Sequence, residues 1–331
     1  MTLDIHYNVG GCYRTPREDI ELAKRAVDAG FGGVWIGDHF HPWIDSRPYT
    51  HQAYPWLAVL LAEVPDVPVG VSVTCPLFRY EPPSLAQTVA TLDNMFPGRF
   101  NLGLGVGEAL NEGSFVDGEW PDWGTRAGML VESIEVMRDL WNGDEYANHD
   151  GEYFSYDRVK LHTPPTADIP VHWAGWGSQS CRLGGRRAGN LITAAEPEEI
   201  ADEIVPAFEA GLADAGRDRA DADVSVEVTV NVGDPDELVA EIRDRGELLP
   251  KSELDNPDPR AILSVARDRL DGMSDAEVAA ANNVTDDPET LVETFAAFED
   301  AGVDRLLVSS NCGDAGRTVD ALGDHVLPQF E

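Results

Sequence analysis

The chain has 331 residues, 43% of them hydrophobic, which is enough for a large core. Acidic residues outnumber basic ones by 60 to 24, giving a formal net charge of -36, which argues against nucleic acids and anionic membranes as partners. No apolar run approaches the roughly 20 residues of a membrane span, and no charged leader opens the sequence, so we expect a cytoplasmic protein.

The negative charge also indicates where the protein works. Acidic residues are spread along the chain, and the regular apolar periods between them argue against disorder. Such self-repulsion destabilises a fold in dilute buffer and is screened in concentrated salt, where the Debye length falls to about 3 Å. We therefore expect a protein of a halophile. The cysteines form no CxxC pair and are expected to be reduced thiols: Cys12, Cys75, Cys181 and Cys312.

Short apolar runs alternate with amphipathic helical stretches along the whole chain. Strands are predicted at residues 3–9, 33–36, 67–74, 100–105, 171–174, 191–194, 224–232 and 305–309. Helices are predicted at residues 17–29, 54–62, 84–96, 126–141, 179–188, 198–215, 288–301 and 318–330. Two insertions, a small hairpin and an acidic helical segment, are expected after strands four and seven, at residues 142–166 and 235–283.

This alternation predicts one fold class. Strand–helix repeats require parallel pairing with right-handed crossovers, and eight repeats close into a (β/α)8 TIM barrel, here one domain over residues 1–331. A doubly wound sheet is the alternative, but no GxGxxG opens a helix after the first strand. Barrel active sites lie where strands end on the carboxyl face, which selects the loops to consider.

The loop after strand two, GDHFHPW, allows two interpretations. His39 and His41 form an HxH, a spacing that can bind a metal in a hydrolase. Alternatively, His39, with an ordinary pKa of roughly 6.5, is an acid–base group. Glu108, in the glycine-lined GLGVGE segment after strand four, could then hold a proton near neutral pH.

A third strand end offers backbone donors. In AGWGSQS, after strand five, Ser178 is a candidate helix cap, and exposed N–H groups at a helix start suit a phosphate. A plain helix cap explains the same residues.

Several of these segments together resemble one family. DHFHPW, SVTCPLFRY, GLGVGEALNE and RRAGNLI are similar to the luciferase-like barrel enzymes, and most of all to the branch of coenzyme F420-dependent glucose-6-phosphate and alcohol dehydrogenases. The resemblance implies a deazaflavin in the barrel mouth, with FMN as the alternative coenzyme, and a cytoplasmic homodimer.

The resemblance also implies roles for individual residues. His39 would deprotonate the substrate hydroxyl, Trp43 would pack beside the reacting centre, and Glu108 would supply a proton at the deazaflavin. A non-prolyl cis peptide is expected at Ser72–Val73. The residues expected to bind the coenzyme are Asp38, Ser72, Val73, Cys75, Val106, Gly107, Asn111, Gly175, Gly177 and Ser178.

The chain departs from the phosphosugar enzymes where they carry basic residues. The segment after strand six reads TAAEPEE, and residues 281–283 read ANN where an arginine is expected. A dianionic phosphate would be poorly held without those cations. We therefore expect an unphosphorylated sugar or a secondary alcohol, with Arg79 or Arg260 available for a different anion. Glucose 6-phosphate, a luciferase-like monooxygenase or reductase reaction, and a metal-dependent hydrolase remain the alternatives.

Overall fold

The predicted barrel is confirmed by the computed structural model, which describes residues 3–64, 66–249, 253 and 255–330. Within these ranges parallel strands close a barrel in the order β1-β12-β9-β8-β7-β4-β3-β2. The barrel strands are β1 (Asp4–Asn8), β2 (Val34–Ile36), β3 (Val69–Thr74), β4 (Phe100–Leu104), β7 (Val171–Ala174), β8 (Asn190–Thr193), β9 (Val224–Thr229) and β12 (Arg305–Ser309).

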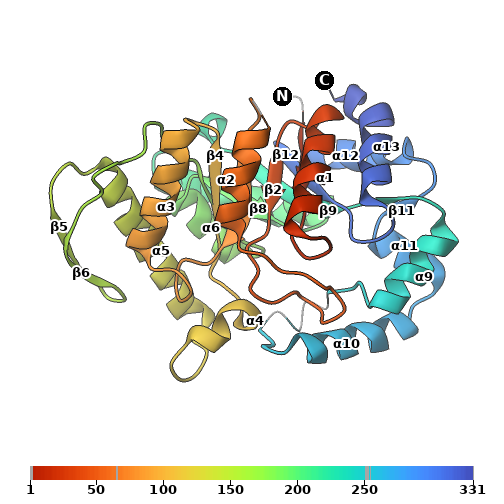
Figure 1. Ribbon diagram of the computed structural model, residues 1–331, viewed down its shortest axis with the longest axis horizontal. Coiled ribbons are helices and arrows are strands. Elements are labelled where there is room, and N and C mark those ends of the chain that lie inside the picture. The colour runs from red at the N-terminus through yellow and green to blue at the C-terminus, as the bar shows by residue number, and fades with distance from the viewer. Residues whose placement is uncertain (1–2, 65, 250–252, 254, 331) are drawn as a thin grey trace.

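Helices cover the outside of the barrel (Figure 1). The main ones are α1 (Pro16–Asp28), α2 (Ala53–Glu63), α3 (Pro82–Met95), α5 (Trp123–Asn142), α6 (Ser178–Arg187), α8 (Val205–Asp214), α12 (Thr290–Asp300) and α13 (Ala315–His325). Local signals set their starts. Thr15 and Glu18 form a capping box ahead of α1, and Asp122 accepts from the Thr125 N–H, so α5 begins three residues before the predicted position.

Strand β2 shows how the apolar pattern divides between two cores. Val34 and Ile36 belong to the main hydrophobic core, whereas Trp35 packs in a separate cluster with Ile192 and Leu307. Side chains alternate between the two faces of a strand, so these two sets lie on opposite sides of the barrel wall. Gly70 on β3 leaves room for the indole, because a Cβ there would lie 2.4 Å from Trp35.

The predicted single strand over residues 224–232 is wrong in one respect. The barrel strand β9 ends at Thr229, and a second short strand, β10 (Asn231–Val232), pairs in parallel with β11 (Val284–Thr285) outside the barrel. The Val230 N–H still bonds to the Ser309 carbonyl, but the Asn231 N–H bonds to that of Asn283. The chain therefore leaves the barrel at residue 230.

Two segments between barrel strands, residues 142–166 and 235–283, contain elements outside the barrel. The first contains an antiparallel hairpin of β5 (Ala147–Asp150) and β6 (Ser155–Val159). The second contains α9 (Pro235–Arg245), α10 (Pro259–Asp271) and α11 (Asp275–Ala281), with a small core that includes Leu238, Ile242, Leu270 and Val278.

Short elements complete the described chain. They are α4 (Ala109–Glu112), α7 (Pro197–Glu199), a π-helical turn (Ile200–Ile204) and the 3-10 turns Gly113–Phe115, Arg219–Asp221 and Leu327–Gln329. The helix predicted over residues 198–215 is therefore divided by the π-helical turn. In the ranges that the structure covers, no helix has the length and hydropathy to cross a membrane.

Candidate active site

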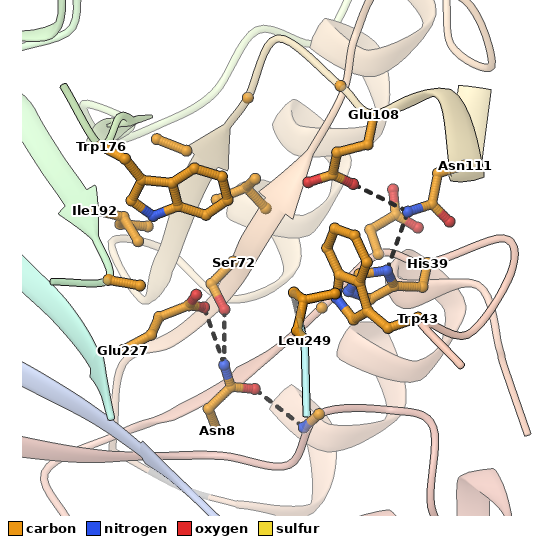
Figure 2. A pocket seen from close by; sticks show the side chains of 18 of the residues that line it. Asn8, His39, Trp43, Ser72, Glu108, Asn111, Trp176, Ile192, Glu227 and Leu249 are labelled. Carbon is orange, nitrogen blue, oxygen red and sulfur yellow. Dashed lines mark hydrogen bonds between the residues drawn. The ribbon is translucent and has the colours of Figure 1, made fainter. Parts of the chain in front are cut away.

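A cavity of about 800 Å³ opens at the carboxyl ends of the barrel strands. Figure 2 shows part of its lining, with Glu227, Ser72 and Asn8 on one side and His39 and Trp43 on the other. Among the residues predicted for the site, the lining includes Asp38, His39, Trp43, Ser72, Val73, Cys75, Val106, Gly107, Glu108, Asn111, Gly175 and Gly177.

The loop after β2 separates its two histidines. The His39 ring lies edge-on to Trp43, with centroids 5.6 Å apart, and both side chains line the cavity. His41 instead bonds through Nδ1 to the Leu110 carbonyl at 2.8 Å. Within the described ranges, no group of three or more His, Cys, Asp or Glu side chains is placed to hold a metal ion.

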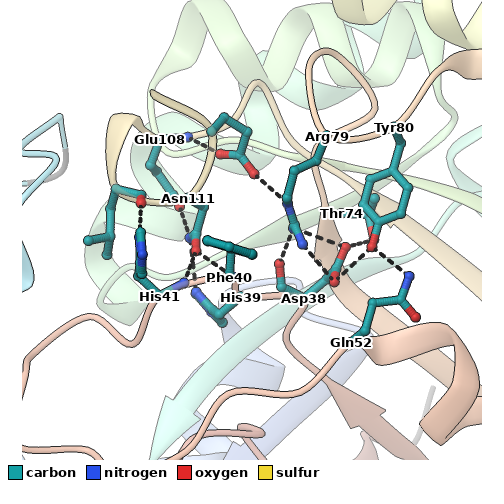
Figure 3. A network of polar contacts seen from close by, with 12 residues as sticks. Asp38, His39, Phe40, His41, Gln52, Thr74, Arg79, Tyr80, Glu108 and Asn111 are labelled. Carbon is teal, nitrogen blue, oxygen red and sulfur yellow. Dashed lines mark hydrogen bonds and ion pairs between the residues drawn. The ribbon is translucent and has the colours of Figure 1, made fainter. Parts of the chain in front are cut away.

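Asp38, also on this loop, is buried and held by its neighbours (Figure 3). Its carboxylate accepts from the Thr74 hydroxyl at 3.0 Å and the Tyr80 hydroxyl at 3.1 Å. Arg79 adds an ion pair at 3.2 Å. The guanidinium also lies 3.6 Å from Glu112, so Arg79 serves two protein carboxylates.

The short helix α4 brings two predicted residues next to His39. Glu108 precedes the helix and Asn111 lies within it. The Asn111 amide nitrogen lies 3.1 Å from His39 Nδ1 and 3.2 Å from Glu108 Oε2. One amide thus bridges the two groups that the sequence predicts to transfer protons.

Burial shifts the pKa of both groups in opposite directions. It lowers the pKa of His39 to about 4, aided by the charges of Arg47 and Arg79. It raises the pKa of Glu108 to about 7. Neutral imidazole and protonated carboxyl are the forms that low polarity favours, so at neutral pH His39 is uncharged and about half of Glu108 keeps its proton.

The wall opposite His39 is formed by β3 and β9. The Ser72–Val73 peptide is cis, as the resemblance implies, and Val73 packs against the cluster of Trp35, Ile192 and Leu307. Asn8 Nδ2 donates to Ser72 Oγ at 3.0 Å and to Glu227 Oε1 at 3.3 Å. Burial raises the pKa of Glu227 to about 7.

Three sequence predictions need correction. The helix cap predicted at Ser178 is wrong, because the N-cap of α6 is Gly177 and Ser178 is its first residue. Ser178 is exposed and lies outside the cavity lining, and its coenzyme contact stays a prediction. Arg79 is bound to Asp38 and Glu112, and Arg260 bonds to Asp258 away from the cavity lining. Neither arginine is therefore placed to bind a substrate anion in this cavity.

Several lining residues were missed. Glu227 is one, and its signal is a single acidic residue in the otherwise apolar or small strand VSVEVT. Arg47 and Arg126 also line the cavity, paired with Glu247 at 2.7 Å and Asp255 at 3.5 Å. These pairs join segments far apart in sequence, so local patterns carry no signal for them.

Comparisons with known proteins agree with this site. Residues 3–324 match the model of the luciferase-like monooxygenase family. The chain is 33% identical to an F420-dependent glucose-6-phosphate dehydrogenase of Rhodococcus erythropolis, over 95% of this chain and 94% of that one. It is 34% identical to the enzyme of the same name from Intrasporangium calvum, with the same coverage.

A solved structure is also similar over its full length. It is an F420-dependent secondary alcohol dehydrogenase in complex with an F420–acetone adduct, with a TM-score of 0.91, 31% identity and complete coverage of both chains. This chain belongs to the luciferase-like monooxygenase family. Within that family, the relatives named here are F420-dependent dehydrogenases.

Proposed function

We propose that the chain is a coenzyme F420-dependent dehydrogenase that oxidises the CH–OH group of an unphosphorylated sugar or a secondary alcohol. The observation that carries this proposal is the group of His39, Trp43, Glu108 and Asn111 on one cavity wall, in a chain similar over its length to F420-dependent dehydrogenases. The name of the similar solved structure, a secondary alcohol dehydrogenase, supports the second substrate class.

The cavity fits a flat ring bound against backbone. Gly107 has a φ of +76°, and a Cβ there would lie 2.6 Å from Cys75 Sγ, so the main chain itself forms the surface. Val73 and Ile192 supply an apolar wall, and a Cβ built on Gly177 would enter open space among the described residues. We propose that the coenzyme is held by Asp38, Ser72, Val73, Cys75, Val106, Gly107, Gly175 and Gly177.

When bound, F420 supplies a deazaflavin ring that accepts the hydride removed from the substrate carbon. The chain must then handle the hydroxyl proton and exclude water. We propose that His39 contacts the hydroxyl oxygen, Trp43 packs beside it and Glu108 is the proton donor. A neutral imidazole can meet an oxygen as acceptor, the role predicted from the sequence, or as donor, and the partner of its Nδ1 decides between them.

The charges of the cavity favour a neutral substrate. Its lining arginines are Arg47 and Arg126, and each already has a carboxylate partner. Ala194, Ala281 and Asn282 line the positions where the phosphosugar enzymes are expected to carry cations. Glu227 adds a carboxylate without a basic partner among the described residues. A substrate phosphate in this cavity would be repelled by carboxylates, and no unpaired arginine of the described lining would offset the repulsion.

We also propose that the enzyme works in the concentrated salt of a halophile's cytoplasm, and as a homodimer. The support for the first part is the net charge of -36. At high ionic strength this repulsion is screened within a few ångströms, and the fold no longer has to overcome it.

The test is a substrate survey with purified protein, oxidised F420 and concentrated KCl. Loss of the absorbance of oxidised F420 reports turnover with neutral sugars, secondary alcohols and phosphosugars in parallel. We expect turnover with a neutral substrate and a far lower kcat/KM with glucose 6-phosphate. Efficient oxidation of glucose 6-phosphate alone would overturn the substrate class and leave the coenzyme assignment intact.

A further inference from the structure

The side-chain amide of Asn111 has a fixed orientation. Its Oδ1 accepts hydrogen bonds from the backbone N–H groups of Phe40 at 2.8 Å and His41 at 3.1 Å (Figure 3). Rotating the amide by half a turn would point an NH2 group at two N–H donors. Because Asn111 is buried, that arrangement would leave several polar groups without partners, which the fold strongly disfavours.

This orientation places the amide nitrogen between two catalytic candidates. Nδ2 has two hydrogens, and two acceptors lie within reach, His39 Nδ1 at 3.1 Å and Glu108 Oε2 at 3.2 Å. All four hydrogen-bonding positions of the amide are then occupied by the protein. The side chain has none left for the coenzyme contact that the resemblance implies.

The ring of His39 must therefore accept at Nδ1. A neutral imidazole has a single N–H hydrogen, and a ring nitrogen that accepts a hydrogen bond cannot carry that hydrogen. The hydrogen is consequently on Nε2, which has no partner among the described residues, while the ring lines the cavity.

We propose that Asn111 is a positioning residue that holds His39 as the Nε2–H tautomer, so that His39 presents a hydrogen-bond donor to the substrate oxygen. The catalytic meaning of this inference rests on the proposed function, but the tautomer itself does not. The role of base that the sequence predicts for His39 needs the opposite tautomer at Nε2. As a donor, His39 stabilises the negative charge that develops on the oxygen when the hydroxyl loses its proton.

The proton of the hydroxyl then passes to a carboxylate. Four of the lining carboxylates lie beside an arginine, namely Asp38, Glu112, Glu247 and Asp255. Glu108 is bonded to Asn111 and has the role of proton donor. Glu227 remains, and its described hydrogen-bond partners are the neutral amide of Asn8 and the hydroxyl of Ser72. The O–H bond breaks, the proton joins a Glu227 oxygen, and the electron pair stays on the substrate oxygen beside His39 Nε2–H.

The tautomer can be measured directly, without coenzyme or substrate. Protein labelled with 15N in its histidine rings gives long-range proton–nitrogen spectra that distinguish Nδ1–H, Nε2–H and the doubly protonated ring. The variant His39→Gln identifies the His39 signals by their loss. At neutral pH we expect the Nε2–H pattern for His39; an Nδ1–H or doubly protonated pattern would overturn the proposal.

The variant Asn111→Asp tests the cause. It replaces the donor facing Nδ1 by an acceptor, so we expect His39 to shift to Nδ1–H or to the charged form, and kcat to fall about a hundredfold with the KM for F420 little changed. The exposed Asn142→Asp change is the matched control and should leave both the His39 signals and kcat unaltered. Should Asn111→Asp fail to fold, the wild-type spectrum still decides.

The proton acceptor has its own test. Glu227→Gln keeps the shape of the side chain and removes its ability to take a proton, so we expect kcat for alcohol oxidation to fall at least a hundredfold while F420 still binds. Wild-type turnover in this variant would remove Glu227 from the scheme. An inactive wild-type protein that shows the Nε2–H pattern would refute the proposed function and leave the tautomer assignment standing.

Discussion

Arg47 and Glu247, 200 residues apart in the sequence, form an ion pair of 2.7 Å at the edge of the cavity. The Glu247 side chain is fully buried, Tyr13 donates to it at 3.2 Å, and the Arg47 guanidinium lies 4.7 Å from the centre of the Tyr13 ring. The pair attaches the helical insertion to the loop that carries His39 and Trp43.

Removing the arginine should therefore destabilise the enzyme. Arg47→Met leaves a buried carboxylate without its partner, which costs about 3–5 kcal/mol of unfolding free energy. Denaturant titration in concentrated KCl measures the loss, and the double change Arg47→Met with Glu247→Leu should recover a large part of it. Equal stabilities of the single and double variants would show that the buried charge is not the cause.

His39 and His41 differ in a way that makes them a matched pair. His39→Ala removes a ring that lines the cavity and should lower kcat by about 10² to 10⁴ while F420 still binds. His41→Ala removes a ring bonded to the Leu110 carbonyl and should keep near-native turnover. Steady-state kinetics and F420 titration check both variants. Equal loss in the two would contradict the assignment.

Glu108 should set the alkaline side of the pH profile. A proton donor whose pKa is raised to about 7 by burial is loaded below that pH and empty above it, so kcat should fall as pH rises through about 7. His39, with a pKa of about 4, should not titrate in this range. Glu108→Gln should lower kcat and remove this alkaline limb, while the acidic limb of Glu227, whose pKa burial raises to about 7, stays. An unchanged alkaline limb in that variant would exclude Glu108 as its source.

The same pKa shift of Glu108 makes the stability of the fold depend on pH. The pKa of Glu108 in the fold lies above its ordinary value of 4.5, so the folded protein binds its proton more tightly than the unfolded chain does. The stability that this group contributes is fully present below about 4.5 and declines as pH rises towards 7.

Ala281 offers a gain-of-function test of substrate charge. The residue lines the cavity where the phosphosugar enzymes are expected to carry an arginine. Ala281→Arg should lower the KM for a phosphorylated sugar about tenfold to a hundredfold, the value of one or two charge-assisted hydrogen bonds. Ala281→Gln, with similar length and no charge, should give little change. An unaltered KM in the arginine variant would show that the phosphate group of the sugar does not bind near residue 281.

Salt should be needed for folding. With a net charge of -36, we expect the midpoint of thermal unfolding to rise steeply with KCl concentration and activity to be lost in dilute buffer. Circular dichroism across a KCl series measures this. Full stability at low ionic strength would contradict the halophile proposal.

The barrel was predictable because its signals are local. Apolar runs such as Val34–Ile36 and the capping residues Thr15 and Glu18 define each unit from neighbouring residues alone. The course of residues 224–232 could not be predicted in this way. The chain leaves the barrel at Val230 because of backbone hydrogen bonds to Ser309 and Asn283. Such partners lie many residues away, and the apolar pattern is the same for either course.

The candidate site, like the fold, could be predicted only in part from the sequence. His39 and Glu108 follow strand ends and were identified from their position and type, whereas Trp43 was identified from the family resemblance. The contacts that determine the chemistry of these residues were not identified from the sequence. The amide of Asn111 takes its orientation from the N–H groups of Phe40 and His41. Glu227 faces the cavity from another strand. Sequence patterns indicated candidates for the reacting groups, whereas the protonation states of these groups depend on burial and on contacts across the barrel mouth.

The most direct measurement is anaerobic reduction of F420 in concentrated KCl, followed by its absorbance, with a neutral secondary alcohol or sugar and with glucose 6-phosphate. We expect turnover with the neutral compound, and we expect Ala281→Gln to retain this turnover and His39→Ala to lose it. Absence of F420 reduction by every neutral substrate, together with activity on the phosphosugar or with reduced FMN and oxygen, would contradict it.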